Sequence, residues 1–97
     1  MIEILWEFVV REESKEEFER QYSASGSWAG LFRRSPAYRG TTMLAGESNR
    51  YLTLDRWDSQ EDYEEFRLAN RQEYTELDTR FETLTVSEHC LGIFEMK

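Results

Sequence analysis

YLTLDRWDSQEDYEEF, residues 51–66, passes from an alternating strand pattern into an acidic helical pattern with no glycine or proline between them. The period of two predicts a strand that places four residues on one face: Tyr51, Thr53, Asp55 and Trp57. Ser59 followed three residues later by Asp62 is typical of a helix N-terminal cap, and acids in the first turns suit the helix dipole. We therefore expect a strand joined directly to a helix.

The segment that follows the cap has a continuous helical pattern. Apolar and aromatic residues, with one exception, recur at spacings of three and four: Tyr63, Phe66, Asn70, Tyr74, Leu77, Phe81 and Leu84. Such a stripe predicts one long helix that packs on a sheet. Asn70 is the single polar member, so we expect it to face water, a backbone group or a ligand.

Three further strands are predicted from alternation. Residues 2–10 form a strand with one apolar face and one mixed face. Residues 38–45 pair with residues 50–57 around a turn-forming loop at 46–49. Residues 87–96 form the last strand, with Cys90, Gly92, Phe94 and Met96 on one face and His89, Leu91, Ile93 and Glu95 on the other.

The first helical region is predicted to be bent. Ser14 and Glu17 have the spacing of a capping box, which predicts a helix start at Ser14. We expect this helix to end near Gly26, where glycine adopts the left-handed conformation easily. Ser27 then caps a short second turn that carries Trp28 and Phe32 inward.

The order strand, helix, strand, strand, helix, strand predicts an α+β fold, the ferredoxin-like βαββαβ arrangement with a four-stranded antiparallel sheet. Residues 1–97 form a single domain in this interpretation. Helices cover one sheet face, but apolar residues occur on both faces of the first and last strands. A monomer would leave an apolar patch in water, so we expect a homodimer whose two sheets face each other in a dimeric α+β barrel.

Composition excludes several partner classes. Twenty Asp and Glu against twelve Lys and Arg give a net charge of -8, which opposes binding to nucleic acid or to an anionic membrane surface. No apolar run approaches a membrane span, and Met1 leads directly into a strand pattern, so we expect a cytoplasmic protein. One cysteine and one histidine, Cys90 and His89, argue against a disulfide and against a metal site.

The sequence resembles the antibiotic biosynthesis monooxygenase family of dimeric α+β barrels over nearly the whole chain. Four stretches carry the resemblance: Glu19–Tyr22, Gly26–Arg33, Tyr38–Thr41 and Tyr51–Ser59. The family contains cofactor-free oxygenases of phenolic or quinol-like rings, haem-degrading enzymes, signal-molecule isomerases and proteins without an assigned activity. The resemblance therefore implies the fold directly and an activity only as a hypothesis.

Departures from the family pattern narrow that hypothesis. Quinol-oxidising relatives often carry a histidine about nine residues after the tryptophan that ends the third strand, where this chain has Phe66. Haem-degrading relatives typically use an asparagine in the first strand and a tryptophan and a histidine on the second helix, where this chain has Glu7, Phe66 and Glu76. The absent imidazole argues against haem ligation.

The sequence suggests a cofactor-independent monooxygenase of an aromatic, phenolic or quinol-like small molecule, or else a non-catalytic dimeric binding or accessory protein of the same fold. Residues expected to line a pocket are Trp28, Phe32, Tyr51, Asp55, Trp57, Phe66, Asn70 and His89. Asp55 and His89 are alternative bases, Arg56 is a candidate oxyanion partner, and the sequence does not decide which residue is catalytic. Each also has a structural interpretation: Trp57 as core, and Arg56 as the ion-pair partner of Glu3 or Glu7 across the sheet.

Overall fold

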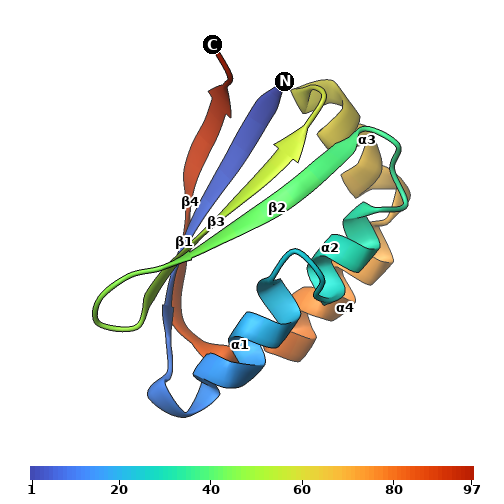
Figure 1. Ribbon diagram of the computed structural model, residues 1–97. Helices are drawn as coiled ribbons and strands as arrows, with labels where there is room; N and C mark the ends of the chain where they lie inside the picture. The colour runs from blue at the N-terminus through green and yellow to red at the C-terminus, as the bar shows by residue number, and fades with distance from the viewer.

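The computed structural model describes residues 1–97 and has the predicted ferredoxin-like α+β fold. Its antiparallel sheet has the order β2-β3-β1-β4. The strands are β1 (Ile2–Val10), β2 (Tyr38–Ala45), β3 (Arg50–Trp57) and β4 (Thr85–Glu95). The α-helices are α1 (Lys15–Tyr22), α2 (Ser27–Phe32), α3 (Gln60–Ala69) and α4 (Arg71–Phe81), with short 3₁₀ turns η1 (Glu12–Ser14) and η2 (Glu82–Leu84). Figure 1 shows the helices gathered on one face of the sheet. None of them is both long and apolar enough to cross a bilayer.

The junction between β3 and α3 forms as its sequence predicts. The Ser59 hydroxyl accepts a hydrogen bond from the Asp62 backbone N–H at 3.1 Å, which caps α3. Alternate residues of β3 are buried under the helices, from Tyr51 to Trp57. Because only Asp58 and Ser59 separate the strand from the capped helix, the chain turns back over the sheet without a longer loop.

The core lies between the sheet and the helices in two clusters. The larger contains Trp57, which is 0% exposed and packs against the rings of Phe32, Tyr63 and Phe66. The smaller surrounds Phe18, which is likewise fully buried. Aromatic residues make up six of the eleven buried members of the larger cluster and three of the four in the smaller one.

The prediction of one long second helix is wrong. The helix divides into α3 and α4 at Asn70, whose φ of -122° and ψ of 29° are not helical. The Asn70 side-chain amide donates to the Phe66 backbone carbonyl at 3.0 Å. The backbone carbonyl of Asn70 accepts from the Tyr74 backbone N–H at 2.9 Å. Asn70 therefore caps both helices at the break, and the apolar stripe continues because the second helix resumes on the same side of the sheet.

The predicted caps of the first helical region also differ. Ser14 forms no side-chain cap, since its φ of -107° and ψ of 1° are not the extended backbone of a capping residue, and the Glu17 carboxylate accepts from Arg20 and Gln21 instead. Helix α1 ends at Tyr22, and Gly26 rather than Ser27 is the N-cap of α2. A β-carbon on Gly26 would lie 2.3 Å from the Gln21 carbonyl oxygen, so only glycine allows the two helices to approach this closely.

The predicted division of β4 into two faces is interrupted by a bulge. The register shifts between Leu5 and Trp6 of β1, where Gly92 has a φ of +140°. Cys90 therefore shares the helix-side face with Ile93, whereas His89 lies on the opposite face with Phe94. The prediction counted every second residue along the whole strand. It is wrong beyond the bulge, because one extra residue there exchanges the two faces.

The sheet face away from the helices is partly apolar and electrically balanced. Leu5 and Leu54 are cross-strand neighbours at its centre and are half-buried, while Phe94 is 52% exposed. The predicted partner of Arg56 is confirmed, since its Nε lies 2.7 Å from Glu3 Oε1. A second pair joins Arg50 to Glu7 on the same face. The charges of this face thus compensate one another within the chain.

A candidate active-site cavity

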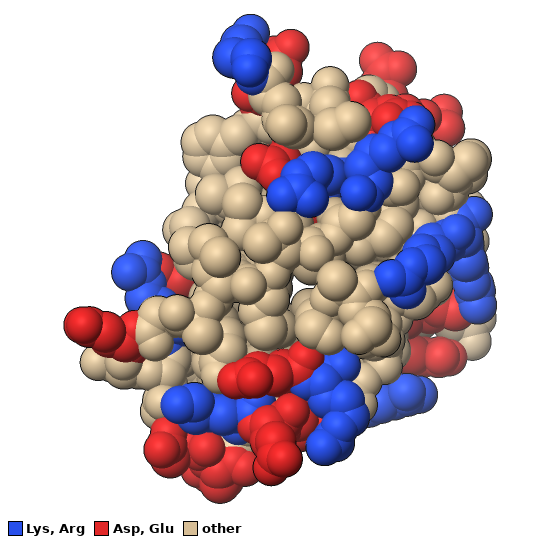
Figure 2. Space-filling model, in the orientation of Figure 1, with Lys and Arg blue, Asp and Glu red and all other residues tan.

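A cavity of about 140 Å³ lies between the helices and the middle of the sheet. Figure 2 shows the surface hollowed between the region over the sheet and the region over the helices. Tyr51 and Trp57 fill the space over the two ends of β3, but Thr53 and Asp55 between them are smaller. The small side chains at mid-strand leave the space that the helices do not fill.

The walls of the cavity are aromatic. Six rings line it: Trp6, Phe8, Tyr22, Trp28, Phe32 and Tyr74. Trp28 is 8% exposed and meets Tyr74 edge to face, with 4.9 Å between the ring centroids. The Trp28 indole Nε1 is buried and has no hydrogen-bond partner. The walls therefore suit a flat unsaturated ligand.

Asp55 is the buried acid of the cavity. Its side chain is 7% exposed, and the Thr41 hydroxyl donates to its Oδ1 at 2.7 Å. Thr41 in turn is hydrogen-bonded to the Tyr38 hydroxyl, so that β2 orients the carboxyl group. No cation pairs with Asp55, and burial raises its pKa to about 6. At neutral pH the carboxylate is ionised but poorly solvated, which is a suitable state for a general base.

The exposed side of the cavity carries ionised groups from three elements. Arg67 comes from α3, Asp78 from α4 and Glu88 from β4, and all three line the space. The Arg67 guanidinium lies 4.7 Å from the centroid of the Tyr74 ring, a cation–π contact. The opening is thus polar while the interior is aromatic.

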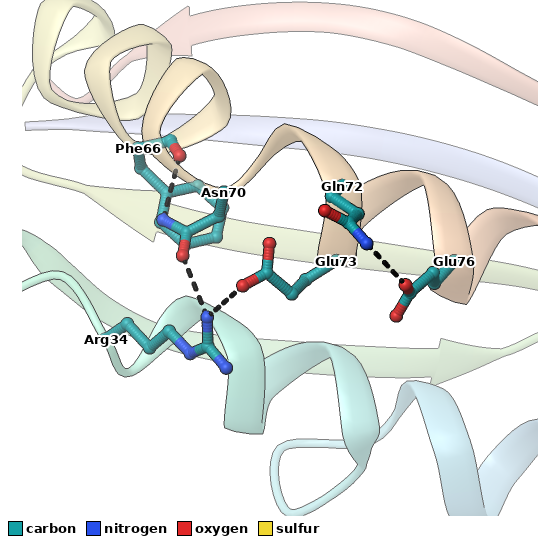
Figure 3. A network of polar contacts seen from close by, with 6 residues as sticks. All are labelled: Arg34, Phe66, Asn70, Gln72, Glu73 and Glu76. Carbon is teal, nitrogen blue, oxygen red and sulfur yellow. Dashed lines mark hydrogen bonds and ion pairs between the residues drawn. The ribbon is translucent and has the colours of Figure 1, made fainter.

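A polar network fixes α2, which carries Trp28 and Phe32. Figure 3 shows Arg34, just after α2, lying between Asn70 and Glu73 at the break between α3 and α4. Its Nη1 lies 3.1 Å from Asn70 Oδ1 and 2.7 Å from Glu73 Oε2. The break in the second helix therefore serves as the attachment point for the segment that forms one cavity wall.

The structure brings three of the sequence-predicted residues to the cavity, namely Trp28, Phe32 and Asp55. Tyr51, Trp57 and Phe66 are buried in the core and do not line it. The Tyr51 hydroxyl is hydrogen-bonded to Glu19 on α1 rather than to a cavity group. These three residues therefore stabilise the core and do not contact a ligand in the cavity.

Two other predicted residues lie outside the cavity. Asn70 is a cap, and the backbone group that it contacts is the Phe66 carbonyl. His89 is exposed on the opposite face of the sheet, paired in register with Glu7. Of the two alternative bases, only Asp55 reaches the cavity.

Sequence reasoning missed several lining residues: Trp6, Phe8, Tyr22, Thr41, Thr53, Arg67, Tyr74, Asp78 and Glu88. A signal for one of them, Thr53, was present in the strand pattern. Thr53 shares with Asp55 the buried face between Tyr51 and Trp57, and two consecutive small polar positions on such a face indicate a space above it. Arg67, Asp78 and Glu88 carry no such signal, because their convergence depends on how α3, α4 and β4 meet. No group of three or more His, Cys, Asp or Glu side chains is placed to hold a metal ion.

Comparison with known proteins supports the fold through structure alone. No protein-family model and no curated protein matches the sequence. A variant of SnoaB, a cofactor-independent oxygenase from Streptomyces nogalater, superposes with a TM-score of 0.79 and 20% identity, covering 99% of this chain and 92% of that chain. A candidate antibiotic biosynthesis monooxygenase from Bordetella bronchiseptica superposes with a TM-score of 0.77 and 14% identity. This match covers 99% of this chain and 96% of that chain.

A third structure, a candidate antibiotic biosynthesis monooxygenase from Deinococcus radiodurans, gives a TM-score of 0.77 at 11% identity and covers 100% of this chain and 93% of that chain. The chain therefore has the fold of the antibiotic biosynthesis monooxygenase structures, as the sequence resemblance implied. At these identities the likeness concerns the fold, and the chemistry must be argued from the cavity.

Proposed function

We propose that this protein is a cofactor-independent oxygenase of a small phenolic or quinol-like ring, with Asp55 as the general base. The observation that carries the proposal is a buried carboxylate at the interior of an aromatic cavity, held by Thr41 and paired with no cation. Among the structures that share the fold, SnoaB is a cofactor-independent oxygenase.

The proposed reaction begins with proton transfer from a ring hydroxyl to the Asp55 carboxylate. The resulting phenolate is electron-rich enough to react with dioxygen, and the aromatic walls keep bulk water away from it. For a hydroquinone, one oxygen atom enters the ring and the other leaves as water, which yields a hydroxyquinone. The substrate supplies all four electrons that reduce dioxygen, so the balance requires no separate reductant.

Oxygen consumption tests this proposal directly. We expect uptake with single-ring hydroquinones in the absence of added flavin or metal, and slower uptake with anthrones, whose three fused rings exceed a cavity of about 140 Å³. Trp28→Ala should reduce uptake at least tenfold because it removes a wall, about 1.4 kcal/mol of binding or more. Trp28→Phe keeps a ring and serves as the matched control. An oxygen electrode gives the rates.

The cavity also suits the second candidate, a binding or accessory protein without catalysis. Its volume is below the roughly 300 Å³ at which ligand pockets usually begin, and three predicted pocket residues fill the core instead. Tight binding of a ring without oxygen uptake across the whole panel would select this function.

We also propose that two copies assemble through the sheet face opposite the helices. Leu5 and Leu54 lie at its centre, and the pairs Glu3–Arg56 and Glu7–Arg50 neutralise its charges. Two such faces can approach without repulsion although the chain as a whole carries a net charge of -8.

Sedimentation equilibrium at micromolar concentration is expected to give a dimer. Leu54→Glu should yield a monomer, because it places an uncompensated charge at the centre of the contact. Leu68→Glu is the matched control, since Leu68 is 67% exposed on α3 and far from this face. A stable monomer of the unmodified chain would rule out the assembly.

A further inference from the structure

The cavity has an excess of negative charge that the proposed reaction does not use. Its lining contains Asp55, Asp78 and Glu88 but only one cationic side chain, Arg67. Proton abstraction requires Asp55 alone. The other two carboxylates lie on the exposed side, where a ligand enters.

Neither Asp78 nor Glu88 forms an ion pair in the protein. They come from different elements, α4 and β4, yet are close enough that the charge of Asp78 contributes to raising the pKa of Glu88, after burial. Burial likewise raises the pKa of Asp78, which Arg67 partly offsets. The two carboxylates outnumber the one nearby cation, Arg67, and therefore favour a further positively charged group.

The aromatic part of the lining favours an organic cation over a metal ion. Tyr22 lines the cavity together with the two acids, and a ring face attracts an ammonium group, whereas the Tyr74 ring already contacts the Arg67 guanidinium. Two carboxylates are too few for a metal site of protein ligands, and no third His, Cys, Asp or Glu joins them.

The size of the cavity limits the rest of the ligand. A volume of about 140 Å³ is close to that of an engineered apolar cavity, roughly 150 Å³, that holds one benzene molecule. At the interior end, the Thr41 hydroxyl donates a hydrogen bond to Asp55 Oδ1. Asp55 Oδ2 has no hydrogen-bond partner in the protein. A single ring with a hydroxyl group directed at Asp55 therefore fits within this volume, whereas a fused polycyclic ring would extend through the opening.

We propose that the ligand is a single-ring phenol bearing a protonated amine on a short side chain, with its hydroxyl at Asp55 and its ammonium group between Asp78 and Glu88. The inference rests on the proposed function only in placing the ring in the same cavity. It adds a substrate class, phenols with an alkylammonium side chain, and assigns Asp78 and Glu88 as the residues that select it.

Three probes with the same ring test the inference: tyramine, which is cationic, 4-ethylphenol, which is neutral, and 3-(4-hydroxyphenyl)propionate, which is anionic. Titration calorimetry at neutral pH should give tyramine an affinity at least tenfold higher than that of 4-ethylphenol, with the anion weakest. In the double variant Asp78→Asn, Glu88→Gln, tyramine should bind no better than 4-ethylphenol.

Glu76→Gln is the matched control, because Glu76 lies on α4 as Asp78 does but outside the cavity. It removes a charge from the same helix and should leave the tenfold preference intact. Equal binding of tyramine and 4-ethylphenol, tighter binding of the anion, or a preference that survives the double substitution would each overturn the inference.

Binding and oxidation are measured separately, so the two proposals can fail separately. Selective binding of tyramine without oxygen uptake would refute the oxygenase and leave the amine site in place. Oxidation of hydroquinones without any preference for the amine would refute the amine site and leave the oxygenase.

Discussion

Asp55→Asn is expected to lower the rate of oxygen uptake by about 100-fold or more, the usual contribution of a general base. Asparagine has nearly the same shape and can still accept the hydrogen bond from Thr41, so the cavity wall should stay in place. The unmodified protein should gain activity as the pH rises through about 6, where Asp55 ionises. The variant should lack this rise.

The same substitution should increase stability at pH 7. The pKa of Asp55 rises from 3.8 to about 6 on folding because the carboxyl group is buried, and this rise corresponds to roughly 3 kcal/mol. A raised carboxyl pKa means that the folded state binds more protons. The contribution of Asp55 to stability is therefore most favourable below pH 3.8 and is lost as the pH rises to about 6. Asp55→Asn should remove this loss.

Urea denaturation at pH 4 and pH 7, combined with oxygen uptake, checks both effects. Asp58→Asn is the control, because Asp58 is a partly exposed acid bonded to Arg39 outside the cavity, and its loss should leave the rate unchanged. A variant of Asp55 that keeps its rate within threefold of the parent would show that the carboxyl group has only a structural role.

Trp57→Ala is expected to lower the free energy of unfolding by about 3 to 5 kcal/mol, which is a large fraction of the stability of a small domain. The indole is 0% exposed, and four rings pack within 5.6 Å of it, centroid to centroid. Its removal would leave a void where β3, α2 and α3 meet.

Trp57→Phe provides the comparison for that substitution. The Trp57 Nε1 has no hydrogen-bond partner, so phenylalanine loses ring volume without losing a hydrogen bond. Its loss in free energy of unfolding should be less than half of the loss in the alanine variant. Thermal or urea unfolding should be compared at one protein concentration, because assembly would add to the apparent stability. A loss below 1 kcal/mol for Trp57→Ala would contradict the assigned core role.

The sequence was sufficient for the parts of the fold that depend on periodicity. Alternation in β1 and β3 and the Ser59 cap are local features, and the structure confirms them. The break at Asn70 was hidden because the apolar stripe runs through it, and a polar residue within a stripe does not reveal which backbone groups it will cap. The bulge in β4 depends on pairing with β1, which no pattern within β4 records.

The candidate site was predictable only in part, for the same reason. Trp28 and Asp55 could be proposed because a large ring just after the predicted helix end at Gly26 and an acid on a buried face are visible in the chain. Whether a ring fills the core or lines a space depends on its neighbours across the layer. Trp57 and Trp28 are both buried, but only Trp28 borders the cavity.

The void over β3 exists because Thr41, Thr53 and Asp55 are shorter than the side chains that would fill it. A chain with leucine or methionine at these positions could keep every strand and helix while becoming solid inside. Evolution could thus gain or lose an activity on this scaffold with a few substitutions, because the architecture does not depend on them. Homologues that superpose closely with this protein need not share its chemistry. The residues at these three positions should be compared first to decide whether a homologue has the cavity.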